Sequence, residues 1–156
     1  MGQYYKAVNV DDMEHVEPHD YDNGAKLMEH SYIGNNFVEA VEFLLIDTGK
    51  NKNRWSGKRI VWAGDYANPE PMEGETLYSL VDKPLKMLIE AVPTNYKYLV
   101  NLDKKEFVDK SKCNIMSSEK KSKLVIHPLP ILTVDGNGRG GGDYHQEEGE
   151  PTYVGR

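Results

Sequence analysis

Two stretches of the chain repeat one pattern, and this pattern constrains the fold more than any other feature. Residues 5–11 read YKAVNVD and residues 97–103 read KYLVNLD. In each stretch, aromatic and aliphatic side chains favour a strand, Asn and Asp then favour a turn, and a glutamate with apolar neighbours follows. Both stretches therefore predict a β-hairpin, with Asn9 and Asn101 at the entrances of the turns.

The repeat allows two interpretations. Hairpins share turn chemistry, so the likeness can arise without any relation between the two parts of the chain. Alternatively, the chain consists of two related halves, roughly 1–66 and 95–156, joined by a helical segment 76–92. Under either interpretation, the length of 156 residues fits a single domain, 1–156.

The other elements follow from periodicity and from the positions of proline. Apolar residues at positions 37, 38, 41, 44 and 45 form one helical stripe, with Asn35 or Asn36 as the N-cap. Pro128 and Pro130 favour short edge strands on either side of a bend. Strands are also expected at 59–65, 124–126 and 131–134, and helices at 76–82 and 85–92. We therefore expect an α+β fold: a mostly antiparallel sheet with two hairpins and two or three helices on one face.

Composition and charge exclude several classes of protein. The single cysteine, Cys113, excludes an intramolecular disulfide and a multi-cysteine zinc site, and we expect neither a metal nor a cofactor. The net charge of −6 disfavours non-specific binding of nucleic acid, which depends on many phosphate contacts. Apolar runs are short, so we expect no membrane span, and we expect a cytoplasmic protein. A homo-oligomer is compatible with these features.

A glycine-rich loop is the clearest candidate for a binding site. Five glycines lie within residues 136–142, and Arg139 stands among them. Glycine lets backbone N–H groups approach a ligand, and a guanidinium suits a phosphate or a carboxylate. The spacing does not support a dinucleotide fold, a calcium loop or a phosphate-binding Walker loop. The candidate ligand residues here are Gly136, Asn137, Gly138, Arg139, Gly140, Gly141, Asp143 and Tyr144.

A basic loop is the second candidate. Residues 50–59 hold five Lys or Arg and no acid, and Trp55 could stack on a planar ring. We expect Arg54, Trp55, Arg59 and Asp65 to contribute to the same ligand site. The opposite charge is concentrated in residues 7–25, which hold six acids and no Lys or Arg. Such charge runs are also typical of solvated faces without a binding role. His127 is interpreted as a structural histidine.

Three segments carry a family resemblance: MGQYYK at the N-terminus, WAGDY at 62–66, and HPLPILT with GNGRGGGDY near the C-terminus. With these motifs the chain resembles a group of small uncharacterised proteins of bacteria and their phages. The resemblance covers most of the chain, implies one common fold and a bacterial or phage setting, and transfers no activity or catalytic residue.

Three functions are compatible with these features. The first is a binding protein, not an enzyme, that holds a small phosphorylated or nucleotide-like molecule. In a phage setting it could sequester a host immune signal. The second is a protein–protein inhibitor of a host factor that uses the acidic N-terminal face. The third is a hydrolase in which Asp65 and Asp143 form a carboxylate pair. A glycine loop far from both Arg59 and Asp65 would weaken the first and third readings.

Overall fold

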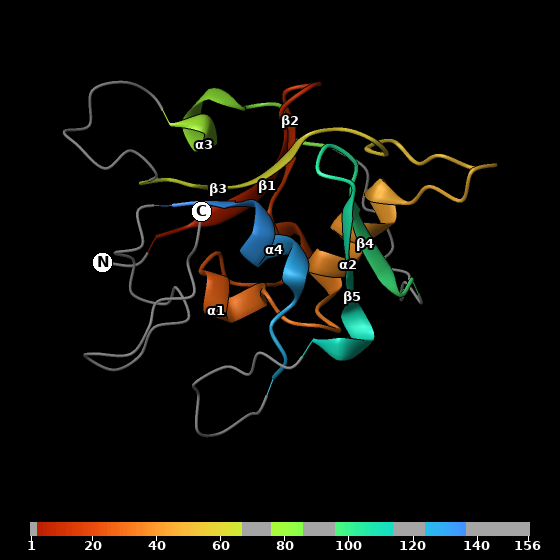
Figure 1. Ribbon diagram of the computed structural model, residues 1–156. Coiled ribbons are helices and arrows are strands. Elements are labelled where there is room, and N and C mark those ends of the chain that lie inside the picture. The colour runs from red at the N-terminus through yellow and green to blue at the C-terminus, as the bar shows by residue number, and fades with distance from the viewer. Residues whose placement is uncertain (1–2, 67–75, 86–95, 114–123, 137–156) are drawn as a thin grey trace.

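The computed structural model describes residues 3–66, 76–85, 96–113 and 124–136, and they form an α+β fold (Figure 1). A four-stranded sheet has the order β2-β1-β3-β6, and β4 and β5 form a separate two-stranded sheet. The strands are β1 Tyr5–Asn9, β2 Glu14–Val16, β3 Ile60–Gly64, β4 Tyr98–Asn101, β5 Glu106–Asp109 and β6 Val134–Asp135. The helices are α1 Leu27–His30, α2 Asn36–Leu45, α3 Leu77–Leu80 and α4 Pro128–Thr133, with short 3-10 helices at Pro18–Tyr21 and Lys110–Lys112.

Both predicted hairpins are present. Strands β1 and β2 pair antiparallel with Val8 opposite His15, and β4 pairs antiparallel with β5. In each turn the asparagine side chain accepts two backbone N–H groups, those of the second and third residues after it. Asn9 Oδ1 does so at 3.0 and 3.1 Å, and Asn101 Oδ1 does so at 3.1 Å to both. The turn chemistry read from the sequence is therefore the same in the two hairpins.

Strand β1 lies between β2 and β3 and carries apolar side chains on both faces. Because side chains alternate along a strand, Tyr5 and Ala7 point to one face while Val8 points to the other. The first face packs against the main core, where Trp62 and Phe37 are fully buried. Every residue of β1 is consequently buried, as expected for a central strand covered on both sides.

Three of the helices lie on one face of the four-stranded sheet, as expected, and α3 lies on the other face. In Figure 1, α1, α2 and α4 lie below the sheet and α3 lies above it. Val81, at the end of α3, packs with Val8 and Ala63 in a second, smaller cluster. Helix α3 is also shorter than predicted, because it spans Leu77–Leu80 and not 76–82. The predicted helix 85–92 lies largely outside the described residues.

Helix α2 is the predicted amphipathic helix, and its start is set by capping. Asn35 Oδ1 accepts the backbone N–H groups of Phe37 and Val38, two donors that have no partner within the helix. The apolar stripe that begins with these residues is buried against the sheet, together with Val41. The cap and the stripe thus agree on where the helix begins and which side it buries.

Helix α4 takes the place of most of the strand expected at 131–134, while Ile126 of the strand expected at 124–126 forms an isolated antiparallel bridge to Tyr32. Pro128 occupies the first turn of the helix, where a missing N–H costs nothing, and His127 Nδ1 accepts the N–H of Leu129 at 3.0 Å. The predicted strand 131–134 is reduced to the two-residue β6, which runs parallel to β3. The sheet is therefore mixed, although its other strand pairs are antiparallel.

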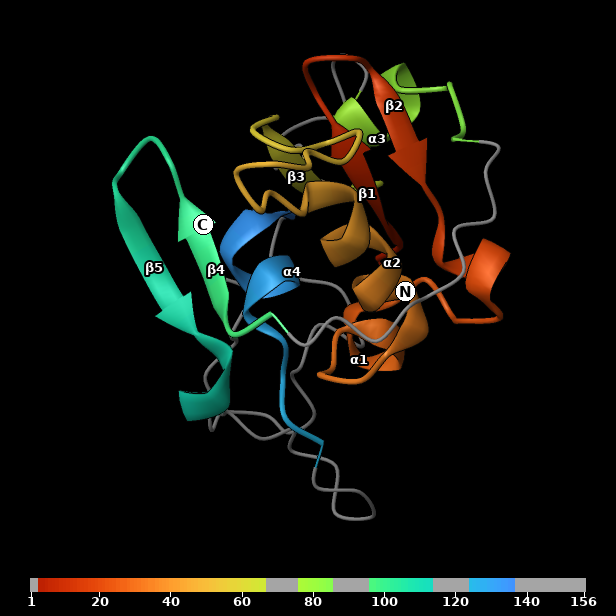
Figure 2. The ribbon, with the colours of Figure 1, turned by 90° about the vertical axis from the view of Figure 1, so that its right-hand side faces the viewer.

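The β4–β5 hairpin stands beside the body as an arm (Figure 2). Leu99, on its inner face, packs against the main core. At its base, Lys110 Nζ donates to Glu42 Oε2 of α2 at 2.6 Å, and both side chains are largely buried. No helix in the described part of the chain is long and apolar enough to cross a membrane.

Candidate functional site

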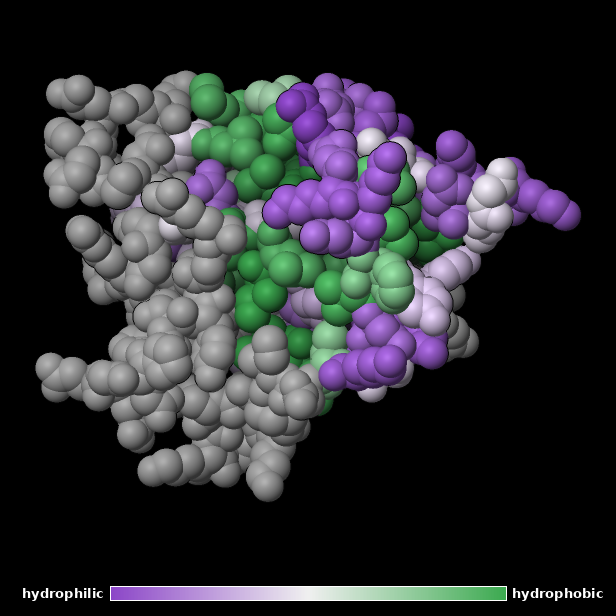
Figure 3. Space-filling model, in the orientation of Figure 1, coloured by the Kyte–Doolittle hydropathy of each residue, from purple (hydrophilic) through white to green (hydrophobic). Residues whose placement is uncertain are grey.

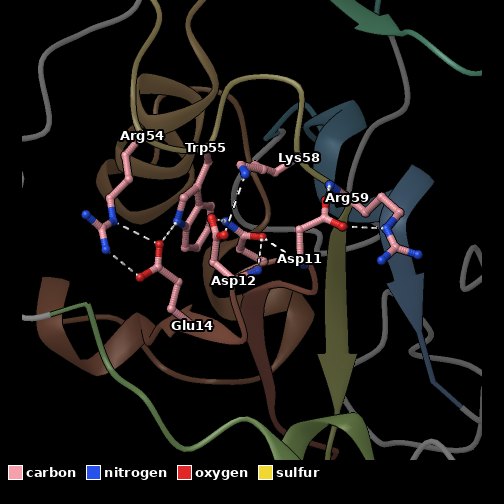
Figure 4. Close-up of polar contacts among 8 residues, drawn as sticks. Asp11, Asp12, Glu14, Arg54, Trp55, Lys58 and Arg59 are labelled. Carbon is pink, nitrogen blue, oxygen red and sulfur yellow. Dashed lines mark hydrogen bonds and ion pairs between the residues drawn. The ribbon is translucent and has the colours of Figure 1, made fainter.

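The acidic turn after β1 and the basic loop before β3 pair with each other (Figure 4). Asp11 accepts the backbone N–H of Arg59 at 2.7 Å and its Nε–H at 2.8 Å. These two hydrogen bonds, the backbone one foremost, lower the pKa of Asp11. Lys58 Nζ lies 3.5 Å from Asp12 Oδ1 in the same interface. Three carboxylates of the acidic run thus pair with three cations of the basic loop: Asp11 with Arg59, Asp12 with Lys58, and Glu14 with Arg54.

Glu14 forms the buried end of this interface. Arg54 donates to both of its carboxylate oxygens at 2.9 Å, and the indole N–H of Trp55 donates to Oε1 at 2.8 Å. Glu14 is 1% exposed and Trp55 is 0% exposed. The hydrogen bonds from Arg54 lower the pKa of Glu14 despite its burial. In this structure the Trp55 ring belongs to the core, and its polar atom is committed to Glu14.

The structure separates the predicted ligand residues into two groups. Arg59 directly precedes β3 and Asp65 directly follows it, so an extended strand of roughly 16 Å lies between them. Arg54 and Trp55 lie with Arg59 at the first end of the strand. Asp65 lies at the other end, where the glycine-rich loop begins, because β6 runs parallel to β3 with Ala63 opposite Asp135.

The carboxyl ends of β3 and β6 meet around two glycines. A Cβ atom on Gly64 would lie 2.6 Å from Gln3 Nε2, and one on Gly136 would lie 2.5 Å from Tyr5 Oη. Tyr5 Oη donates to Gln3 Oε1 at 2.7 Å, while Gln3 Nε2 is buried and has no hydrogen-bond partner among the residues that the structure describes. Asp65 Oδ1 accepts the backbone N–H of Tyr4 at 2.9 Å, and burial raises the pKa of Asp65.

The remaining residues of the predicted glycine-loop site lie outside the described residues. They are Asn137, Gly138, Arg139, Gly140, Gly141, Asp143 and Tyr144. The ligand loop and the Asp65/Asp143 carboxylate pair therefore stay predictions. What the structure adds is that the residue at which this loop begins, Gly136, lies at the same sheet end as Asp65 and far from Arg59.

A histidine–glutamate pair between α2 and α4 was not anticipated from the sequence. His127 Nε2 lies 2.5 Å from Glu42 Oε1, and Lys110 Nζ donates to the other oxygen. Burial raises the pKa of Glu42, but the His127 and Lys110 contacts outweigh it, and the net pKa is lowered. Because His127 Nδ1 accepts the N–H of Leu129, this ring has no nitrogen left to act as a base. The structural interpretation of His127 is confirmed.

The sheet face under α3 holds a buried lysine. Lys6 Nζ donates to the carbonyl oxygen of Val81 at 2.8 Å and lies 4.5 Å from the ring centre of Tyr78. Burial lowers the pKa of Lys6. Beside it on β2, His15 Nε2 lies 3.2 Å from Glu17 Oε1. The two Lys6 contacts attach the α3 segment to the sheet, so the amine is committed to holding the fold.

The outer face of the β4–β5 hairpin is the feature that the rest of the fold leaves unexplained. Tyr98, Val100, Leu102 and Phe107 are 53%, 56%, 66% and 66% exposed. The strand register places Val100 opposite Phe107, and the Tyr98 ring meets the Phe107 ring edge-on, with centroids 5.3 Å apart. We call these four side chains the hairpin face. Contiguous apolar surface of this kind marks interaction sites.

The hairpin face is hollowed near its turn. A shallow depression of about 420 Å³ is lined by the four side chains of the hairpin face and, on its polar side, by Asn101, Lys105 and Glu106. Figure 3 shows hydrophobic atoms running down the middle of the described surface, across the position of α4 in Figure 1, with hydrophilic atoms gathered beside them. The sequence predicts a strand here, because residues 98–100 and 102 are aromatic or aliphatic, but such a run does not show which face of the strand is exposed.

Comparisons with known proteins add no further constraint. No protein-family model matches the chain, and no similar protein was found among curated proteins or solved structures.

Proposed function

We propose that this chain is a protein-binding protein that contacts its partner through the hairpin face. The supporting observation is the exposure of Tyr98, Val100, Leu102 and Phe107 on one side of two strands. A lone two-stranded hairpin is marginally stable in water and gains from further burial. The inner face of the hairpin is already partly buried, because Leu99 packs against the main core. Nothing among the described residues covers the outer face.

The proposal differs from the inhibitor expected from the acidic N-terminal face. Asp11, Asp12 and Glu14 of that face are paired with Arg59, Lys58 and Arg54 of the basic loop. Carboxylates that are already paired offer a partner less attraction. We therefore place the proposed interaction on the hairpin face and not on the acidic run. The aromatic side chains of the hairpin face are typical anchors of protein interfaces.

A matched pair of variants tests this function. Phe107→Ser removes the most exposed aromatic of the hairpin face, and Leu80→Ser removes an exposed leucine of α3 outside that face. Proteins captured from a lysate of the source cells by each variant and by the unchanged chain are quantified by mass spectrometry. We expect a partner that is lost with Phe107→Ser and kept with Leu80→Ser. Equal capture by all three chains would contradict the proposal.

Ligand binding at the carboxyl ends of β3 and β6 is the second candidate. It is favoured by the buried, unpartnered Nε2 of Gln3 beside Gly64 and by the glycine-rich segment that follows Gly136. Ligands commonly bind at the carboxyl ends of parallel strands. The ligand expected there remains a phosphorylated or nucleotide-like molecule, and the sequestration of such a host signal remains a prediction.

Native mass spectrometry of the purified chain tests the second candidate by looking for a retained small molecule. If one is found, Arg139→Ala should weaken its binding by roughly tenfold or more, because a charge-assisted hydrogen bond is lost. The melting temperature should stay nearly unchanged. A sharp fall in melting temperature with unchanged binding would assign Arg139 a structural role instead.

A further inference from the structure

The charge around the hairpin face is opposite in sign to that of the chain as a whole. Residues 96–113 hold five lysines and three acids, a net charge of +2, whereas the whole chain carries −6. Two of the lysines are paired, Lys97 with Asp109 and Lys110 with Glu42. The lysines of the turn, Lys104 and Lys105, have no such pairing to a carboxylate within the described residues, and Lys105 borders the hollow of the hairpin face together with Glu106.

The hairpin also presents backbone edges. Strands β4 and β5 pair with each other, and neither pairs with another strand among the described residues. Within the described part of the chain, each strand therefore leaves one row of N–H and C=O groups open to a further strand. A strand added there would extend the hairpin face, because its alternate side chains would lie beside Tyr98 at the β4 edge or beside Phe107 at the β5 edge.

We infer that the partner presents an extended acidic segment, with apolar residues at alternate positions, which adds as a strand to this hairpin. The inference rests on the proposed function and names the chemistry of the partner. Apolar side chains of the segment would occupy the hollow between Val100 and Phe107. The carboxylates nearest the turn would meet Lys104 and Lys105.

Two other occupants fit these observations less well. A second copy of the chain would bring the unpaired lysines of two hairpin faces together, and like charges oppose that contact. Single-stranded nucleic acid needs aromatic faces on which successive bases stack. Here the rings of Tyr98 and Phe107 meet at 87°, so they do not offer parallel faces to successive bases. An acidic polypeptide segment satisfies both the apolar face and the positive rim.

An unbiased selection tests the inference. A display library of random ten-residue peptides is selected on the unchanged chain, with the Phe107→Ser variant used to remove peptides that bind elsewhere. We expect the selected peptides to be rich in Asp and Glu, with aromatic or aliphatic residues at alternate positions. Synthetic copies are then measured by fluorescence anisotropy at low and high salt.

Binding of the selected peptides should weaken tenfold or more with Phe107→Ser, as expected for an aromatic anchor. It should weaken roughly three- to tenfold with Lys104→Gln and Lys105→Gln together, and further at high salt. The control Lys52→Gln, in the exposed 47–52 loop, should leave binding unchanged. Selected peptides that are basic or uncharged, or binding that ignores both turn lysines and salt, would overturn the inferred partner chemistry.

Two further measurements address the other occupants. Binding of a labelled deoxythymidine oligonucleotide that depends on Phe107, in place of acidic peptides, would overturn the inference in favour of nucleic acid. A dimer in sedimentation equilibrium that Phe107→Ser dissociates would overturn it in favour of a second copy. If Phe107-dependent capture of a cellular partner holds while the acidic peptides fail, the proposed function stands and the partner chemistry is wrong.

Discussion

Trp62 donates its indole N–H to Nε2 of His30 at 2.9 Å, in the core between the sheet and α1. On the other side of the ring, His30 Nδ1 lies 2.9 Å from the carbonyl oxygen of Gly24, to which it donates. One nitrogen accepts and the other donates, so the neutral tautomer satisfies both partners and a protonated ring does not. Burial lowers the pKa of His30 from 6.5 to about 4.

This arrangement predicts that acid destabilises the fold before its carboxylates titrate fully. Between pH 6.5 and about 4, the unfolded chain binds a proton at His30 and the folded chain does not. The contribution of neutral His30 to the free energy of unfolding is therefore complete above pH 6.5 and is lost as the pH falls. The loss approaches about 1.4 kcal/mol per pH unit, or roughly 3 kcal/mol across the window. Urea denaturation at several pH values measures it.

The source of this pH dependence can be assigned with two variants. His30→Gln should remove most of the slope, although the variant is itself less stable. His19→Gln, at an exposed position, should keep the slope of the unchanged chain. Burial also lowers the pKa of His15, so a smaller slope of the same sign should remain in His30→Gln. A free energy of unfolding that is constant from pH 6.5 to 4.5 would contradict the assignment.

The second prediction concerns Glu14, which joins the acidic turn to the basic loop. Glu14→Ala leaves the buried N–H of Trp55 without an acceptor, and an unsatisfied buried donor costs roughly 1–3 kcal/mol. Glu14→Gln keeps an oxygen for Trp55 and should cost less. Lys52→Ala breaks an exposed 3.7 Å ion pair to Asp47 and should change stability by less than about 0.5 kcal/mol. Equal losses in Glu14→Ala and Lys52→Ala would refute a structural role for the cluster.

The third prediction concerns the single cysteine. Cys113 is partly buried, its Sγ lies 3.7 Å from the carbonyl oxygen of Asp109, and burial raises its pKa. Little thiolate is therefore present at pH 7, and the thiol should react slowly with iodoacetamide compared with free cysteine. Cys113→Ser should leave the melting temperature and partner binding unchanged. Fast alkylation, or loss of binding in the serine variant, would indicate thiol chemistry.

Local signals in the sequence were sufficient for the elements that depend on local chemistry. The turns at Asn9 and Asn101 and the cap at Asn35 are side-chain-to-backbone contacts within three residues, and such contacts are visible in a sequence. The strand around Trp62 was also predicted, because its apolar run is short and bounded by polar residues. By contrast, α4 was misread, since proline suits both an edge strand and the first turn of a helix.

The candidate site depends on contacts between distant parts of the chain, and these could not be predicted. Arg54 and Arg59 looked available for a ligand because their partners, Glu14 and Asp11, lie 40 and 48 residues away. The exposure of Phe107 could not be inferred either, because an apolar residue in a strand is usually buried. Phe107 is exposed because β4 and β5 form a separate two-stranded sheet outside the four-stranded one.

The last prediction uses the two hairpin turns as a matched pair. Asn9 is fully buried, and besides accepting two N–H groups its Nδ2 donates to Asp12 Oδ2 at 3.0 Å. Asn101 makes the same two backbone contacts but is exposed. Asn9→Ala should therefore lower the free energy of unfolding by roughly 1–3 kcal/mol, since part of the turn cannot be solvated once the side chain is removed.

Asn101→Ala should cost less than about 0.5 kcal/mol globally, because water replaces the lost contacts at an exposed turn. Its effect should instead be local: amide hydrogen exchange in residues 98–109 should accelerate, while exchange in β1 and β3 stays unchanged. Asn101→Asp keeps the acceptor oxygen beside the turn lysines and should restore slow exchange. Asn9→Asp should rescue less, because the new carboxylate lies beside Asp12. If both alanine variants unfold at the same denaturant concentration, burial of the turn does not set its contribution, and the β4–β5 arm is as integral to the core as the β1–β2 hairpin.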